Sequence, residues 1–157
     1  MVLKIHDSGF TLLELLIAMG IAMVLIGGVF AGYERFNRNE RLRQAGSTLK
    51  SNLRLAESKA ISGEKPQAAC SQLTGVAVTF STNSYMLQAQ CGASLVGLQI
   101  EVILPLTLTI SSTVSPLVFR VLNRGVEADV TITITDGSKS YVVTVSQSGD
   151  INDNGII

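Results

Sequence analysis

The 157-residue chain has one histidine, two cysteines and few charged residues. Because His6 lies among the first residues, a Ser/His or Cys/His catalytic pair and a histidine zinc site are excluded from the folded part. Acidic residues of the C-terminal half are scattered, without a cluster for acid/base catalysis. Basic and acidic residues balance at 12 each, so bulk charge does not favour nucleic acid. We expect no enzyme, no cofactor and no small-molecule substrate.

A long uncharged stretch, residues 15–32, follows the single carboxylate of Glu14. As a helix it extends roughly 27 Å, close to the thickness of a bilayer. We therefore predict the transmembrane half of a helix over residues 10–32. An unpaired carboxylate in hydrocarbon is costly, so Glu14 needs a partner. Two other interpretations stay open: a secretory signal peptide cleaved after Val29-Phe30-Ala31, and a plain N-terminal anchor.

The N-terminal sequence "G-FTLLELLIAMGIAMVLIGG" resembles the class III signal of type IV prepilins and type II secretion pseudopilins. The resemblance implies a leader, residues 1–9, which prepilin peptidase cuts off between Gly9 and Phe10 before methylating the new amine of Phe10. In that family the glutamate at the position of Glu14 meets the N-terminal ammonium of a neighbouring subunit and promotes assembly. The alternative for Glu14 is a place at the headgroup boundary at little energetic cost.

The resemblance also implies a single-pass protein of the inner membrane, with the C-terminal domain in the periplasm and with other pilin or pseudopilin subunits as partners. Arginines after the apolar stretch weakly favour the opposite orientation by the positive-inside tendency; they are Arg35, Arg38, Arg41 and Arg43. Orientation is therefore taken from the resemblance. Gly28 and Gly32 form a Gly-x-x-x-Gly pair, which either packs against another helix or is merely tolerated.

Apolar residues then recur every three or four positions, as on one face of an amphipathic helix: Leu42, Ala45, Leu49, Leu53, Ala56 and Ala60. This predicts the soluble half of the helix over residues 33–62, ending near Ser62-Gly63. The sequence "RLRQAGSTLKSNLRLAESKAIS" resembles the corresponding helix of GspH/FimT minor pilins.

From residue 74 the apolar period becomes two, which predicts antiparallel strands in a β-sheet domain over residues 63–157. The alternating positions are Val76, Val78 and Phe80; Leu98, Ile100, Val102 and Leu104; Leu117, Phe119 and Val121; and Val126, Ala128, Val130, Ile132 and Ile134. Turns are expected at residues 123–125 and at Asp136-Gly137, the latter in a hairpin. The predicted fold is α+β: a long N-terminal helix packed on an antiparallel sheet, as in pilins. The C-terminal strands also resemble GspH/FimT proteins.

Cys70 and Cys91 are the two cysteines, and a domain outside the reducing cytosol favours a disulfide between them. The alternative is a pair of buried thiols.

The tail "GDINDNGII" places Asp150, Asn152 and Asn154 as in the first half of a calcium loop, but no bidentate glutamate follows. A hydrophilic end segment is therefore favoured over a metal site. Some FimT-like pilins bind DNA through a Gly-Arg-x-Arg element at this place, where this chain has Asp150 after Gly149. No nucleic acid is expected as a partner, because a carboxylate repels phosphate.

Together these features predict a minor pilin or pseudopilin of a type IV pilus or a type II secretion system, with a structural role in filament assembly. Two alternatives remain open at this point. One is a secreted soluble binding domain released by ordinary signal peptidase, and the other is a DNA-uptake pilin.

Overall fold

The computed structural model describes residues 11–66, 70–122 and 125–157, with only the backbone described for residues 28–32 and Leu98. One helix precedes eight strands in this part of the chain: α1 (Leu12–Ser62), β1 (Leu73–Phe80), β2 (Ser84–Cys91), β3 (Ser94–Ile103), β4 (Thr109–Ser112), β5 (Leu117–Arg120), β6 (Val130–Thr135), β7 (Ser140–Val145) and β8 (Ile151–Ile156). The chain divides into two compact units, one up to Asn37 and one from Arg38 to Ile157. The second half of α1 therefore belongs to the same unit as the strands, which we call the globular unit.

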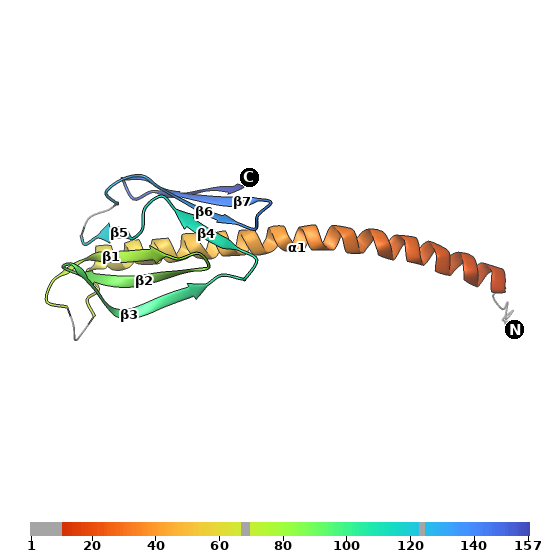
Figure 1. The fold of residues 1–157 in the computed structure, drawn as a ribbon, viewed down its shortest axis with the longest axis horizontal. Coiled ribbons are helices and arrows are strands. Elements are labelled where there is room, and N and C mark those ends of the chain that lie inside the picture. Colours follow the sequence, from red (N-terminus) through yellow and green to blue (C-terminus); the bar gives the residue numbers. More distant parts are fainter. Residues whose placement is uncertain (1–10, 67–69, 123–124) are drawn as a thin grey trace, which may run out of the picture. The chain divides into compact units, whose positions relative to one another are not determined.

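The strands of the globular unit form two antiparallel sheets, one in the order β3-β2-β1-β5 and the other in the order β4-β6-β7-β8 (Figure 1). The predicted α+β class, with a helix packed on antiparallel strands, is confirmed. The expectation of one sheet is wrong. After β3 the chain moves to the second sheet for β4 and returns to the first for β5. Alternation along a strand shows which side is buried, but it does not specify a partner distant in sequence.

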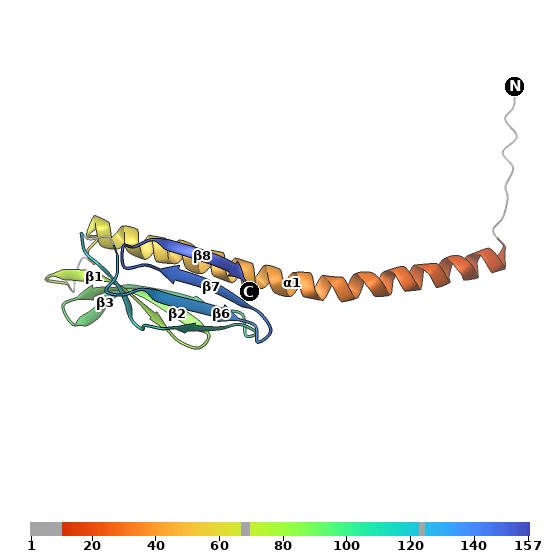
Figure 2. The same ribbon diagram turned by 90° about the horizontal axis from the view of Figure 1, so that it is seen from above.

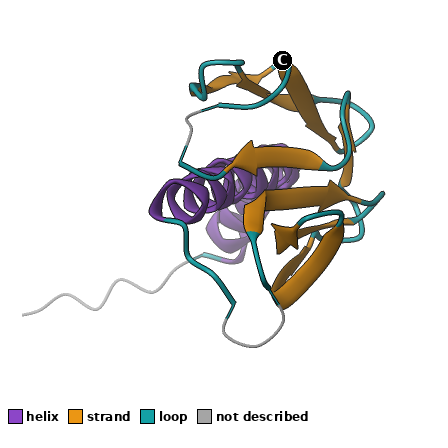
Figure 3. Cartoon of the chain, turned by 90° about the vertical axis from the view of Figure 1, so that its left-hand side faces the viewer, coloured by secondary structure: helices purple, strands orange, loops and turns teal. Residues whose placement is uncertain are grey.

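The second half of α1 lies against both sheets, as the end-on view shows (Figure 3), and its apolar stripe is part of the core. Five stripe residues are fully buried, and Ala45 packs beside them; the five are Leu42, Leu49, Leu53, Ala56 and Ala60. They join one core with Phe119 of the first sheet and Ile132 of the second. The stripe prediction is confirmed, because a helix with one apolar face is stabilised mainly by burying that face.

The C-terminus of α1 lies where the sequence predicts it. Gly63 has a φ of 64°, its amide donates to the Ala60 carbonyl, and the Glu64 amide donates to the Lys59 carbonyl. These two bonds form a Schellman motif, which satisfies carbonyls that the helix leaves without partners. Glycine takes this left-handed conformation without the penalty of a Cβ atom.

Several strand predictions are corrected. β6 begins at Val130, and Ala128 is exposed before it, not on the buried face. The alternation predicted for β1 fails because Ala77 is as fully buried as Val78, in a strand flanked by β2 and β5. Strands β2, β4 and β8 were not predicted. β4 and β8 lack a clear apolar alternation, whereas β2 does alternate, with Tyr85 and Leu87 buried. The predicted turn at residues 123–125 lies mostly outside the described residues.

The Asp136-Gly137 hairpin between β6 and β7 is confirmed. The Asp136 carboxylate accepts hydrogen bonds from the amide and hydroxyl of Ser138 and from the amide of Lys139. These bonds, from Lys139 and then Ser138, and the charge of Arg38 lower the pKa of Asp136. Gly137 has a φ of 87°, which a tight turn of this kind requires.

Cys70 and Cys91 form a disulfide in the structure, which ties the segment before β1 to the end of β2. Their Cα atoms lie 5.5 Å apart. The bond closes a loop with a sequence separation of 21. It therefore restricts the unfolded chain more than a short loop would.

Replacing both cysteines by serine should lower the free energy of unfolding by about 3 kcal/mol, because the unfolded chain regains the entropy of the opened loop. Chemical denaturation followed by circular dichroism measures the change. Reductant should destabilise the original protein by a similar amount and leave the double variant unchanged. Equal stability of both proteins without reductant contradicts this prediction.

Candidate processing and assembly site

Thr11 begins α1 as its N-terminal cap. Its Oγ1 accepts a hydrogen bond of 3.3 Å from the Glu14 amide, and its carbonyl accepts one of 3.2 Å from the Leu15 amide. The spacing Thr-x-x-Glu is that of a capping box, and a carboxylate in the first turn also interacts favourably with the helix dipole. Only the Thr11 half of that box is formed, so the local role of the Glu14 carboxylate at the helix start is its interaction with the helix dipole.

The first unit exposes an apolar surface around α1. Each large apolar side chain between Leu12 and Ile26 is more than half exposed; they are Leu12, Leu13, Leu15, Leu16, Ile17, Met19, Ile21, Met23, Val24, Leu25 and Ile26. Apolar surfaces of this extent normally contact a membrane or another protein. Glu14 is also exposed, and its carboxylate makes no hydrogen bond or ion pair within the described residues. None of the described residues therefore competes with an outside partner for this carboxylate.

The predicted cleavage and methylation site, Gly9 and Phe10, lies outside the described residues. Gly28 and Gly32 lie within α1, in the segment of which only the backbone is described. Within the described residues, no helix combines the length and the apolar character needed to cross a membrane.

The tail forms strand β8 instead of the expected hydrophilic end segment. Ile151 is buried in the core, Ile156 packs beside it, and the strand pairs with β7. Asn152 and Asn154 lie in this extended strand, and Asp150 directly precedes it and accepts a hydrogen bond from the Ser148 hydroxyl. The backbone there is a strand and not a loop around an ion. No group of three His, Cys, Asp or Glu side chains in the described part of the chain is placed to hold a metal.

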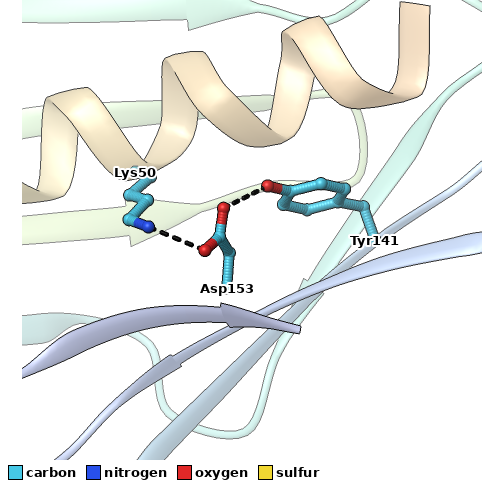
Figure 4. A network of polar contacts seen from close by, with 3 residues as sticks. All are labelled: Lys50, Tyr141 and Asp153. Carbon is cyan, nitrogen blue, oxygen red and sulfur yellow. Dashed lines mark hydrogen bonds and ion pairs between the residues drawn. The ribbon is translucent and has the colours of Figure 1, made fainter. Parts of the chain in front are cut away.

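Strand β8 lies along α1 (Figure 2), and a polar network joins the helix to the second sheet (Figure 4). The Asp153 carboxylate, on β8, accepts a hydrogen bond of 2.7 Å from Lys50 Nζ on the helix and one of 2.6 Å from the Tyr141 hydroxyl on β7. Hydrogen bonds from Lys50 and Tyr141 lower the pKa of Asp153. Burial, followed by the hydrogen bond and charge of Asp153, raises the pKa of Tyr141 to about 12. The network therefore fixes the edge strand β8 to the helix.

Neither this network nor a second link was predicted from the sequence. In the second link, Asn52 Nδ2 donates a hydrogen bond of 2.8 Å to the Tyr85 hydroxyl. Burial raises the pKa of Tyr85, and the bond from Asn52 partly offsets that effect. Each link joins a polar helix residue to a mostly buried tyrosine, Asn52 directly and Lys50 through Asp153. Each therefore depends on how segments distant in the sequence pack. No local pattern in the sequence identifies them.

The network predicts a pH dependence of stability at both extremes. Because the pKa of Asp153 is lower when folded, its contribution is present above the ordinary value of 3.8 and is lost as the pH falls through the folded pKa. Because the pKa of Tyr141 is higher when folded, its contribution is present below pH 10.0 and is lost as the pH rises toward 12. Chemical denaturation at several pH values measures the free energy of unfolding. That of Asp153→Asn should be closest to the value of the original protein in acid, and that of Tyr141→Phe should be closest to it above pH 11. Differences that stay constant across pH contradict the prediction.

Comparison with known proteins adds one match. Residues 5–30 match the sequence model of the family described as the prokaryotic N-terminal methylation motif, and this range contains Gly9, Phe10 and Glu14. No curated protein and no solved structure shows significant similarity to the chain. The match covers the N-terminal segment alone, so membership of the GspH/FimT group stays a prediction. The methylation motif and the packing of a helix on antiparallel sheets together support a type IV pilin-like protein.

Proposed function

We propose that the chain is a minor pilin or pseudopilin, a structural subunit of a type IV pilus or of a type II secretion pseudopilus. The observation that carries the proposal is the methylation motif at residues 5–30, directly before and within a helix whose apolar side chains are exposed. Prepilin peptidase removes residues 1–9 and methylates Phe10, residues 10–32 insert in the inner membrane, and the globular unit lies in the periplasm. A disulfide between Cys70 and Cys91 is compatible with that oxidising compartment.

Cleavage after Gly9 creates the charge that Glu14 needs. The new ammonium of Phe10 and the carboxylate of Glu14 are four residues apart in the sequence. When two subunits assemble, the ammonium of one neutralises the carboxylate of the other in a medium of low dielectric constant, where each unpaired charge is costly. Thr11 supports this role because it caps the Glu14 amide and leaves the carboxylate available. The Gly28 and Gly32 pair allows a close approach of helices in the same bundle.

The proposal is tested by locating the tagged chain in its host. We expect it in the membrane fraction and, after shearing or overexpression of the secretion machine, in filaments together with other pilin subunits. A host without prepilin peptidase is the matched control and should hold the uncleaved chain in the membrane, absent from filaments. Recovery of the chain as a free periplasmic protein in the normal host contradicts the proposal.

A further inference from the structure

The end of β3 and the connection that follows it expose two large apolar side chains. We call residues 103–108, the last residue of β3 and the connection to β4, the β3–β4 loop. Ile103 is 74% exposed and Leu106 is 94% exposed, although Leu104 and Leu108 of the same loop are buried in the core. The Leu104 amide donates to the Asn83 carbonyl, and the Leu108 amide donates to the Pro105 carbonyl. The loop is thus fixed at both ends, and its exposed side chains are held outward by the fold.

Two arginines of α1 accompany this loop. Arg41 lines a groove of about 220 Å³ together with Ile103 and Pro105, and Arg38 lies one helical turn earlier on the same face. Both are exposed, and neither forms an ion pair within the described residues. Cationic and apolar side chains therefore share one end of the globular unit, as is typical of surfaces that contact anionic lipids.

Only a short stretch of sequence separates Arg38 from the proposed membrane segment. Arg38 follows Gly32, the last residue of that segment, by six positions, which corresponds to about 9 Å of helix. Between them are the exposed side chains of Phe36 and of Tyr33, the latter a residue type enriched at membrane interfaces. Residues 33–43 hold four arginines against two glutamates. These arginines oppose the positive-inside tendency in the proposed orientation, and contact with lipid phosphates gives them a role.

We propose that the β3–β4 loop and the neighbouring helix face form a lipid-contact surface: Ile103 and Leu106 insert among the headgroups of the bilayer, and Arg38 and Arg41 bind phosphates of anionic lipids. This inference rests on the proposed function, because residues 10–32 must first anchor the chain. The contact holds the globular unit on the membrane surface until the subunit is incorporated into a filament. Glu40, which accepts a long hydrogen bond from Gln44, and Asp136, which is occupied by its own turn, moderate the positive charge.

The chain lacks tryptophan, so a single introduced tryptophan reports on its own surroundings. Leu106→Trp retains the fold because that side chain is 94% exposed. We reconstitute the full chain in vesicles of phosphatidylcholine and brominated phosphatidylglycerol, which quench tryptophan on contact. Leu106→Trp should be quenched at least twofold. The matched control is Leu95→Trp, because Leu95 is 40% exposed near the start of β3. Leu95 lies about 26 Å along the strand from Ile103. The fluorescence of Leu95→Trp should not be quenched.

Adding Arg38→Gln and Arg41→Gln to Leu106→Trp should lower the quenching to the level that Leu106→Trp alone shows when the same mole fraction of brominated phosphatidylcholine replaces the brominated phosphatidylglycerol. Equal quenching of Leu106→Trp and Leu95→Trp by brominated lipid overturns the inference. Protection of Leu106→Trp from quenching that increases with the protein-to-lipid ratio also overturns it, because it indicates contact with a second copy of the chain. Flotation of the same vesicles separates the two proposals. A chain that fails to float with them contradicts membrane anchoring, and a chain that floats without quenching contradicts only the lipid-contact surface.

Discussion

Glu14→Ala should leave the precursor inserted and cleaved but reduce its incorporation into filaments at least about tenfold. The neighbouring ammonium then has no countercharge in a medium of low dielectric constant, a loss of a few kcal/mol, and about 1.4 kcal/mol corresponds to a tenfold change. The measurement is the ratio of filament-bound to membrane-bound chain on immunoblots, with the mobility of the band reporting cleavage. Incorporation of Glu14→Ala at the original level contradicts the proposed pairing.

Two further variants separate charge pairing from helix capping. Glutamine at position 14 can still take part in a capping box but carries no charge, so Glu14→Gln should fail like Glu14→Ala. Thr11→Ala removes the Oγ1 that accepts a hydrogen bond from the Glu14 amide but keeps the Glu14 carboxylate. This variant should therefore assemble nearly normally. The reverse pattern, with assembly by Glu14→Gln and failure of Thr11→Ala, identifies capping as the important role.

Gly46→Ala should lower the free energy of unfolding of the globular unit by about 4 kcal/mol, although alanine favours a helix by about 1 kcal/mol over glycine. Gly46 is buried, and a Cβ atom built on it lies 2.7 Å from Cγ of Tyr141 and still closer to two other ring atoms. The ring must leave its site and take its hydroxyl away from Asp153. Chemical denaturation of the full chain in detergent measures the loss.

The tyrosine supplies the control for this prediction. In a chain that already carries Tyr141→Ala, Gly46→Ala should be neutral or stabilise by up to about 1 kcal/mol, because no ring remains to clash and the helix propensity improves. Ser47→Ala, at the next and exposed position of the helix, should change stability by less than about 0.5 kcal/mol. A large loss from Gly46→Ala in the Tyr141→Ala background contradicts this contact as the cause.

Local patterns explain why much of the helix and part of the strand content could be predicted from the sequence. The stripe from Leu42 to Ala60 repeats with the helical period, and Gly63 occupies the left-handed position of the helix cap. The same holds for Asp136, whose side chain organises its own turn. Each of these features depends on residues within one or two turns of each other.

The features that the sequence did not predict depend on distant contacts. β4 pairs with β6 and β5 with β1, so the division into two sheets depends on partners that a strand pattern does not name. β8 contains Asn152 and Asp153 and was therefore interpreted as polar end segment, yet its edge position accommodates polar side chains on the exposed side. Gly46 carries no sign in the sequence that a tyrosine ring occupies the space beside it.

The candidate site, in contrast to the sheets, was largely predicted from the sequence. Gly9, Phe10 and Glu14 stand in one short segment, so the resemblance of that segment to prepilin signals implies the processing chemistry, and the methylation motif at residues 5–30 supports it. The structure adds the Thr11 cap and a Glu14 carboxylate that has no partner among the residues it describes. Which subunit meets that carboxylate depends on the filament, which one chain does not contain.

The proposed N-terminal charge at Phe10 is tested most directly by mass spectrometry of the N-terminal peptide of the chain isolated from its host membrane. The account predicts a peptide that begins with N-methylated Phe10, and an uncleaved leader when prepilin peptidase is absent. A mature chain that begins at Gly32, or one that keeps residues 1–9 in the presence of the peptidase, contradicts it.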